Sequence, residues 1–337
     1  MWSLRNETAY ASGRIWGRDK DGVHEWIVVV KGTFDILPDG TLVRAEEQVE
    51  PLLLAEPHGE EGKSSLRYEA DLVGPKPTTD ILLNGTAHAP GGRPASEFMV
   101  SLRVADIHKQ IKVVGPRTWK SGLFSNGPSA AEPVAQVPIT YERAYGGFDQ
   151  SNPDPTQQRL DTRNPVGCGL LTNPGLPVPN FEYPNRRMEQ AGPAGFGPLA
   201  SYWSPRREWQ GTYDDAWKKG RFPLLPADWD PRSLQCSPAD QRPASHLRGG
   251  EPVELVNLTP NGRLSFVLPR LYFSFRTLID KRVEERNGQL ATVIIEPDHP
   301  RVILVWQSVL AVRNEVDYLD ETIITEKEYR GSLATDA

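Results

Sequence analysis

Two cysteines and six histidines are the residues of this 337-residue chain whose types first suggest nucleophilic or metal chemistry. Cys168 lies in an Asn-Pro-Val-Gly-Cys-Gly stretch and Cys236 in a Ser/Pro-rich stretch. Either thiol could act as a nucleophile, but these surroundings favour a buried or incidental cysteine. Two cysteines placed 68 positions apart suit a reducing compartment and give no disulfide framework.

The histidines lack the spacing of a metal site. None stands in a His-x-x-x-His or His-Glu-x-x-His pattern, and the sequence has no Cys-x-x-Cys pair, so we expect no structural zinc. Asp106-x-His108 would place two ligands on one face of a strand, but it falls where a hairpin turn is predicted. Asp298-His299 precedes Pro300 and is also predicted to be a turn. The sequence therefore predicts neither a metal nor a cofactor.

The common catalytic loops are also missing from the sequence. It contains no Gly-x-x-x-x-Gly-Lys-Ser/Thr loop, no Gly-x-Gly-x-x-Gly opening a helix after a strand, and no Gly-x-Ser-x-Gly elbow. Nothing singles out one catalytic pair among 44 acidic residues. We predict no enzymatic activity, and a hydrolase acting on cell-wall or carbohydrate material stays open as the alternative.

The charge and hydropathy of the chain argue against nucleic acid and membranes as its partners. Lys and Arg number 38 against 44 Asp and Glu, a net charge of −6, which argues against a dedicated nucleic-acid binder. No run approaches the roughly 18 apolar residues that span a bilayer. The first residues show no basic region followed by an apolar stretch, so we expect a cytoplasmic protein without a secretory signal.

Proline divides the chain into three parts. Of the 31 prolines, 19 fall within 115–250, where they prevent long central strands and long helices. We therefore expect a β-rich part over 1–114, a Pro/Gly- and aromatic-rich loop segment over 115–250, and a second β-rich part over 251–337. The three parts are expected to form one continuous compact unit.

The N-terminal part carries repeated strand patterns. His24–Val30 is β-branched and aromatic on both faces, which indicates a strand covered on both sides. Pro38-Asp39-Gly40 separates two apolar runs and predicts a hairpin turn. Apolar residues alternate with others from Phe98 to Val104, and 111–114 would return antiparallel to that strand.

The C-terminal part repeats this pattern. Val253–Leu258 and Leu264–Leu268 flank a Pro-Asn-Gly turn, and three more strands are predicted at Tyr272–Leu278, Ala291–Glu296 and Val302–Leu310, the first two of them joined through Asn287-Gly288. Short strands joined by such turns indicate a mainly β fold. We expect an antiparallel β-sandwich or barrel-like sheets with one or two short helices.

One short helix is predicted within the loop segment, near 213–219. Thr212 can cap its start, and Asp215 three residues later completes a capping-box pattern. Gly220 suits the position after the helix end, and Lys218-Lys219 in the last turn match the helix dipole.

The loop segment is the main candidate for a binding surface. Its aromatic content indicates order, and a loop-built surface rich in Tyr, Trp and Arg is typical of protein recognition. The alternative is that these loops merely pack across an open sheet face, and that a Tyr/Arg/Gly cluster pins one of them. The predicted contact residues are Tyr141, Arg143, Tyr145, Tyr202, Trp203 and Trp209.

Several stretches resemble a bacterial family of uncharacterised proteins, domain of unknown function 2169. In order along the chain they are Met1–Ile36, Tyr141–Gly147, Asn164–Gly167, Gly211–Trp217, Asp230–Arg232, Asp240-Gln241 and Gly250-Glu251. The resemblance runs from about residue 2 to 312, nearly the whole chain. Ser233-Leu234-Gln235 departs from the aromatic pair expected after Asp-Pro-Arg.

The resemblance implies a role in type VI secretion. Members are typically encoded beside the spike protein, spike-tip proteins of the PAAR class and toxic effectors. It implies a non-catalytic adaptor or chaperone that binds an effector and helps load it onto the spike, and no catalytic residue is carried over. A structural component of the secretion apparatus is a further alternative.

Overall fold

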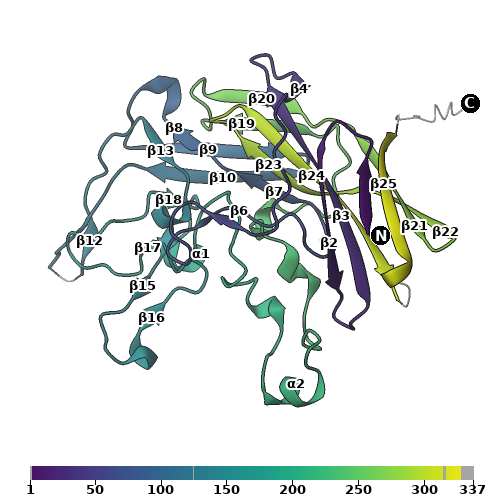
Figure 1. Cartoon of the computed structure of the whole chain (residues 1–337). Helices are drawn as coiled ribbons and strands as arrows, with labels where there is room; N and C mark the ends of the chain where they lie inside the picture. The colour runs from purple at the N-terminus through teal and green to yellow at the C-terminus, as the bar shows by residue number, and fades with distance from the viewer. Residues whose placement is uncertain (1, 124, 314–315, 328–337) are drawn as a thin grey trace, which may run out of the picture.

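The computed structural model describes residues 2–123, 125–313 and 316–327 (Figure 1). The protein is mainly β and its sheets are mostly antiparallel, as the sequence predicts. The largest sheet has the order β2-β3-β24-β23-β7, with β4 added beside β3. Its strands are β2 (Ala11–Arg18), β3 (His24–Ile36), β4 (Leu42–Arg44), β7 (Asp80–Leu83), β23 (Gln289–Glu296) and β24 (Arg301–Val312).

A five-stranded sheet has the order β18-β10-β9-β19-β20. It contains β9 (Glu97–Val104), β10 (Ile107–Val114), β18 (Phe181–Glu182), β19 (Pro252–Val256) and β20 (Arg263–Val267). Alternate side chains of β9 are buried, which confirms the half-buried strand that the period of two predicts. Both predicted hairpins, β9–β10 and β19–β20, are present in this sheet.

A four-stranded sheet, β1-β25-β21-β22, completes the main architecture. Its strands are β1 (Ser3–Asn6), β21 (Tyr272–Ile279), β22 (Arg282–Asn287) and β25 (Leu319–Lys327). The sequence reading missed β22, so Asn287-Gly288 joins β22 to β23 and does not join β21 to β23. The Arg-Val-Glu-Glu-Arg run of β22 is too polar to show a buried face, because this strand lies exposed at the sheet edge.

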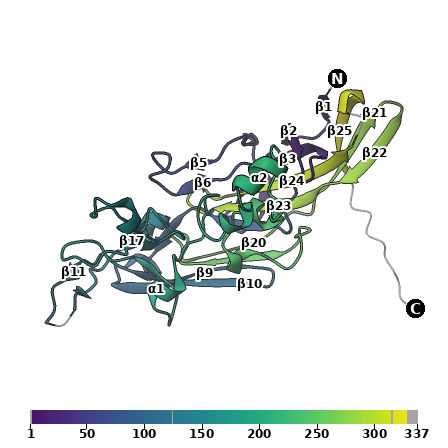
Figure 2. The same ribbon diagram turned by 90° about the horizontal axis from the view of Figure 1, so that it is seen from below.

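The two β-rich parts share their sheets. β3 pairs with β24 along its whole length, and β9 pairs with β19. One hydrophobic core joins Val28 of β3, Leu102 of β9 and Phe275 of β21. Seen from below, β9 and β10 lie on one side of β3 and β24, and β21 and β22 lie on the other side (Figure 2). In the described part of the chain the sheets stay open and form no closed barrel.

Only short elements occur between the sheets. They are β5 (Glu56–Pro57), β6 (Leu66–Tyr68), β8 (Thr86–His88), β11 (Trp119–Lys120), β12 (Gly127–Pro128), β13 (Gln136–Pro138), β14 (Tyr145–Gly146), β15 (Phe148–Asp149), β16 (Arg159–Leu160), β17 (Cys168–Gly169) and the helices α1 (Met188–Ala191) and α2 (Asp215–Gly220). Proline explains their length, because it removes backbone donors from ladders and helices. Within the described residues, none of the helices has the length and apolar character needed to cross a membrane.

The helix α2 starts later than predicted. Its N-cap is Asp214, whose carboxylate accepts a hydrogen bond from the backbone N–H of Trp217 at 2.8 Å. Thr212, the predicted cap, is used elsewhere: its N–H and hydroxyl donate to the carboxylate of Asp228 at 3.0 and 2.7 Å. The helix α2 therefore starts later because Thr212 bonds to Asp228, an acceptor outside the helix that local sequence patterns do not reveal.

A buried carboxylate fastens the loop segment to the largest sheet. Asp80 on β7 accepts hydrogen bonds from the N–H groups of Cys236 and Ser237, both at 3.0 Å, and from the Ser237 hydroxyl at 2.6 Å. It also binds the ammonium of Lys76 at 2.8 Å, which donates in addition to the Thr292 hydroxyl. Burial disfavours the charged form of Lys76, but the attraction of Asp80 outweighs it and raises the Lys76 pKa.

Two further buried cations hold the same segment. Arg206 donates to the carbonyl of Leu199 at 2.6 Å and forms an ion pair with Glu69. Lys109 on β10 donates to the side-chain oxygen of Gln241 at 2.7 Å. Because each cation is almost fully buried, these contacts fix where the loops lie on the sheets.

Candidate protein-interaction surface

A closed loop projects from the body of the protein and carries α2 near its tip (Figure 1). We call residues 211–229 the aromatic arm. Its base is closed by the backbone hydrogen bond from Asp230 N to Trp209 O at 2.9 Å, and by the bonds between Thr212 and Asp228. The arm is therefore a surface segment whose two ends are held together, and surface loops on a rigid scaffold often carry binding residues.

Three aromatic rings pack together on the arm. Tyr213 and Trp217 meet edge to face with centroids 4.8 Å apart, and Trp217 and Phe222 do so at 5.6 Å. The indole N–H of Trp217 donates to the carbonyl of Leu224 at 2.8 Å. Tyr213 is nevertheless 53% exposed and Phe222 66% exposed. The cluster thus holds its shape while presenting aromatic surface to the outside.

The arm is braced against the turn between β2 and β3. The guanidinium of Arg221 donates to the carbonyl of Lys20 at 2.5 Å and lies 3.1 Å from the carboxylate of Asp21. Leu224 packs so closely on Gly22 that a Cβ there would lie 2.7 Å from a methyl group. This brace fixes the arm on one side, so its aromatic rings need little ordering when a partner binds.

A stacked tryptophan stiffens the arm base. The guanidinium carbons of Arg232 and Arg242 lie 4.8 and 5.4 Å from the ring centroid of Trp209. Arg232 is held in turn by Asp230, with Nη2 to Oδ2 at 2.7 Å, and this hydrogen bonding lowers the Asp230 pKa. Cation–π contacts of this kind favour the charged guanidinium beside the ring and restrict the motion of both groups.

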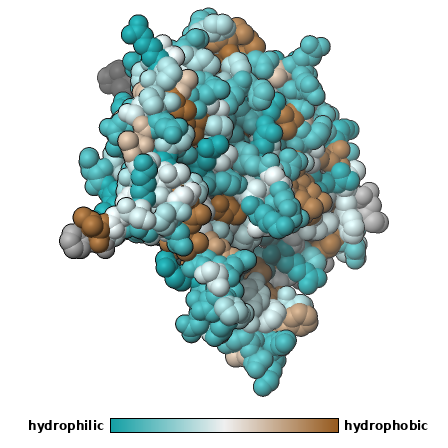
Figure 3. Space-filling view, turned by 90° about the vertical axis from the view of Figure 1, so that its left-hand side faces the viewer, coloured by the Kyte–Doolittle hydropathy of each residue, from teal (hydrophilic) through white to brown (hydrophobic). Residues whose placement is uncertain are grey.

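A second projection lies on the same side of the body as the arm (Figure 1). It is the β15–β16 hairpin, in which Phe148 and Leu160 stand opposite each other and are each 42% exposed. Figure 3 views the molecule from the left-hand side of Figure 1 and shows small apolar patches separated by hydrophilic groups. Such a mixed surface is typical of contacts that form and dissociate.

Three of the six predicted contact residues are buried. Tyr141, Tyr145 and Trp203 lie in the interior, Trp203 with no exposed surface at all. Tyr141 donates from its hydroxyl to the carbonyl of Gly197 at 3.1 Å and packs edge to face on Trp203 at 5.6 Å. In this structure they pin loops, which is the alternative considered from the sequence, and they are not available to a partner.

The other three predicted contact residues reach the surface. Arg143 is exposed, with Nη1 3.5 Å from the side-chain oxygen of Asn180. Tyr202 is 48% exposed, and Trp209 is half-buried between its two arginines.

Sequence reasoning did not select the aromatic residues of the arm as contacts. Tyr213 and Trp217 stand four residues apart in the helix predicted near 213–219, which has no wider apolar stripe. That pattern could have identified an exposed aromatic pair, because a core-facing helix needs a broader apolar face.

The cysteines lie in buried or partly buried surroundings, and the aspartates considered as metal ligands lie in turns. Cys236 is buried in the Asp80 network, where burial raises its pKa, and burial raises the Cys168 pKa to about 11. Asp106 lies in the β9–β10 turn, as predicted, and His88 Nε2 is 3.9 Å from Asp298. Within residues 2–123, 125–313 and 316–327, no cluster of three His, Cys, Asp or Glu side chains could hold a metal ion.

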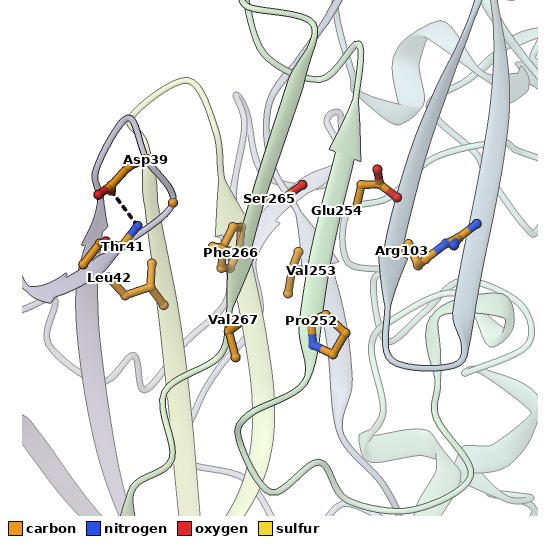
Figure 4. Close-up of a pocket in the computed structure, with 11 residues that line it drawn as sticks. Asp39, Thr41, Leu42, Arg103, Pro252, Val253, Glu254, Ser265, Phe266 and Val267 are labelled. Carbon is orange, nitrogen blue, oxygen red and sulfur yellow. Dashed lines mark hydrogen bonds between the residues drawn. The ribbon is translucent and has the colours of Figure 1, made fainter.

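An open groove of about 680 Å³ lies between the β3–β4 turn and strands β19 and β20 (Figure 4). Leu42, Val253, Phe266 and Val267 supply most of its apolar lining. Two carboxylates also line it, and both are occupied: Asp39 accepts from the N–H of Thr41 at 2.9 Å, and Glu254 pairs with Arg263. The groove therefore offers apolar contact surface beside two carboxylates, of which Glu254 is paired with a cation and Asp39 is hydrogen-bonded within its own turn.

The sequence as a whole was compared with known families. The model of a family described as uncharacterised proteins conserved in bacteria, domain of unknown function 2169, matches residues 21–307. The chain belongs to this family. In this member of the domain of unknown function 2169 family, the matched region runs from just before β3 into β24 and includes the whole aromatic arm. No curated protein and no solved structure matches the chain.

Proposed function

We propose that the protein is a non-catalytic adaptor or chaperone that binds a type VI secretion effector in the cytoplasm. It would help load that effector onto the spike protein or its PAAR-type tip. The secretion role rests on what the family resemblance implies, as set out from the sequence. The binding role is supported by the surface described above.

The observation that carries the proposal is the exposed aromatic cluster of the arm. Tyr213 and Phe222 place large aromatic surface in solvent, on a loop that is closed at its base and braced on the body. Aromatic side chains dominate the energy of protein interfaces, because they bury much area while freezing few rotatable bonds. Because the rings of the arm are already ordered, little entropy is lost when they bind, and more of the contact energy contributes to affinity.

Three other accessible residues are proposed to add to this surface. Tyr202 and Trp209 lie near the arm in sequence, and Trp209 forms its base. Arg143 adds an exposed guanidinium, a group enriched at interfaces. We propose that these three residues and the arm together contact the effector.

The test is co-expression of the tagged protein with the proteins encoded beside its gene, followed by pull-down and size-exclusion chromatography. The proposal predicts co-elution with one toxin or spike-tip protein, and loss of that toxin's solubility when the adaptor is omitted. Elution of the protein alone, with the toxin soluble and secreted in its absence, would refute the adaptor role. A substrate screen for hydrolase activity would then be the next step.

Paired variants locate the contact surface. The double variant Tyr213→Ala/Phe222→Ala removes the exposed rings of the arm and should abolish co-elution. Tyr318→Ala is the matched control, since Tyr318 is 58% exposed and lies outside the arm. Equal loss of binding in both variants, or none in either, would show that the arm is not the contact site.

A further inference from the structure

A pocket opens where the chain passes from the four-stranded sheet to the largest sheet. The crossing occurs at Asn287–Gln289, between β22 and β23, and Gly288 donates from its N–H to the carbonyl of Phe273 at 2.9 Å. The pocket has a volume of about 730 Å³, within the range of ligand sites. The loop 245–248 and the first residues of β21 complete its walls.

The floor of this pocket is apolar and rigid. Leu271, Leu290 and Trp306 supply it, and Leu290 and Trp306 belong to the buried core. The ring of Trp306 packs edge to face on Phe273 with centroids 4.9 Å apart. A side chain entering the pocket would therefore meet a preformed apolar surface.

The pocket lining contains basic side chains and no acidic ones. Arg248, His246 and Lys327 contribute to its walls, and none of the lining residues is Asp or Glu. Lys327 is paired with Glu285 at 2.6 Å, outside the lining, whereas Arg248 makes no ion pair with any residue the structure describes. The Nδ1 atom of His246 lies 3.1 Å from the carbonyl of Leu290, which fixes the orientation of the ring.

We propose that this pocket binds a carboxylate carried on an apolar segment of a partner peptide. The guanidinium of Arg248 would pair with the carboxylate, since arginine matches its two oxygens with two parallel hydrogen bonds. The residue next to the carboxylate would lie on the Leu271, Leu290 and Trp306 floor. One unpaired arginine beside an apolar floor suits a single carboxylate better than a polyanion, and the net charge of −6 disfavours nucleic acid. This inference does not depend on the aromatic arm.

The shared chemistry is a carboxylate beside an aliphatic side chain, which an acidic side chain or a peptide C-terminus can supply. Methyl NMR of the full chain would be titrated with acetyl-Gly-Leu-Glu-Leu-Gly-amide, with its Gln counterpart, and with acetyl-Gly-Leu-Leu bearing a free C-terminus. The proposal predicts saturable shifts of the Leu271 and Leu290 methyl groups with at least one carboxylate peptide, and the tighter binder identifies the source. The Gln peptide should bind at least tenfold more weakly than the tighter of the two carboxylate peptides, which is the loss expected for one charge-assisted hydrogen bond.

Arg248→Ala tests the assigned recognition group. The side chain is exposed, so the fold should be retained, and affinity for the carboxylate peptide should fall by about tenfold or more. Arg93→Ala removes another exposed arginine far from the pocket lining and should bind as the wild type does. The proposal is overturned by the absence of saturable shifts with both carboxylate peptides, by binding of the Gln peptide as tight as that of the tighter carboxylate peptide, or by unchanged affinity for that peptide in Arg248→Ala.

Discussion

Replacement of the buried Asp80 by asparagine is the sharpest test of how the loop segment is held. Asp80 Oδ2 accepts from the Lys76 ammonium and from Cys236 N, and Oδ1 accepts from both donors of Ser237. Asparagine keeps one oxygen and places an NH₂ group against donors at the other position. In either orientation the ammonium loses its carboxylate counter-charge. It keeps the Thr292 hydroxyl as an acceptor, and it also keeps the amide oxygen when that oxygen occupies the Oδ2 position.

The size of the effect follows from this loss. Removing one partner of a buried ion pair costs about 3–5 kcal/mol, because the other charge stays buried without compensation. The loss of an acceptor for a buried N–H adds about 1–3 kcal/mol if Ser237 is the residue left unpaired. Since a typical domain is stable by about 5–15 kcal/mol, Asp80→Asn should remove about a fifth or more of the free energy of unfolding.

Urea unfolding at pH 7, followed by tryptophan fluorescence, measures this loss. Lys76→Met should cost less, because Asp80 keeps its three hydrogen bonds from the 236–237 backbone and the serine hydroxyl. Asp106→Asn, in an exposed turn, is the control and should lie within about 0.5 kcal/mol of the wild type. A loss below about 1 kcal/mol in Asp80→Asn, at an unchanged slope against urea, would refute the reasoning.

The Asp80 carboxylate also makes the free energy of unfolding depend on pH. Burial disfavours its charged form, but Lys76 and the hydrogen bonds from Ser237 and Cys236 outweigh burial and lower the Asp80 pKa. The stabilisation from a lowered pKa is present above the unfolded-state value of about 3.9 and is lost as the pH falls through the folded-state value. Wild-type stability should therefore decline below about pH 4, and Asp80→Asn should decline less steeply.

Three further predictions follow from local contacts. Phe222→Ala should leave the free energy of unfolding within about 1 kcal/mol of the wild type, because the ring is mostly exposed; a larger loss in urea unfolding would mean that the arm supports the fold. Iodoacetamide at pH 7.5 should label neither thiol of the native protein, since Cys236 is buried and fewer than about one Cys168 in a thousand is ionised; rapid labelling counted by mass spectrometry would contradict this. Gly40→Ala should lower the melting temperature by several degrees, because Gly40 has φ +86° and a Cβ would lie 2.1 Å from Ser265 O; an unchanged calorimetric melting temperature would argue against this close turn.

Local sequence patterns were sufficient to predict strands that pair with a neighbour in the same hairpin. The alternation from Phe98 to Val104 and the turns after Leu37 and Leu258 specify strands whose partners lie within a few residues. The polar strand β22 was not predictable in this way, because among the described strands it pairs with β21 alone and its side chains face solvent. Nor could any local pattern show that β3 pairs with β24, more than 260 residues later.

The composition of the loop segment predicted that it would form the candidate surface, but it did not predict which of its aromatic residues are exposed. Tyr202 is 48% exposed and the adjacent Trp203 is fully buried, although both are aromatic and both lie in a proline-rich loop. Their difference is set by contacts that are distant in sequence, such as the packing of Tyr141 on Trp203 and the ion pair between Arg206 and Glu69. Burial of loop aromatics depends on where the loop docks, and the residues that dock it are spread over the chain.

The pairing of β3 with β24 also determines when the protein can fold during synthesis. β3 ends at Ile36, yet its central neighbour in the sheet ends only at Val312, so most of the chain must leave the ribosome before the largest sheet can close. Until then the apolar strand β3 lacks its main partner, a situation in which nascent chains aggregate. We expect truncations that stop before β24 to be insoluble and to depend on general chaperones. The proposed chaperone would thus itself need protection while it is being made.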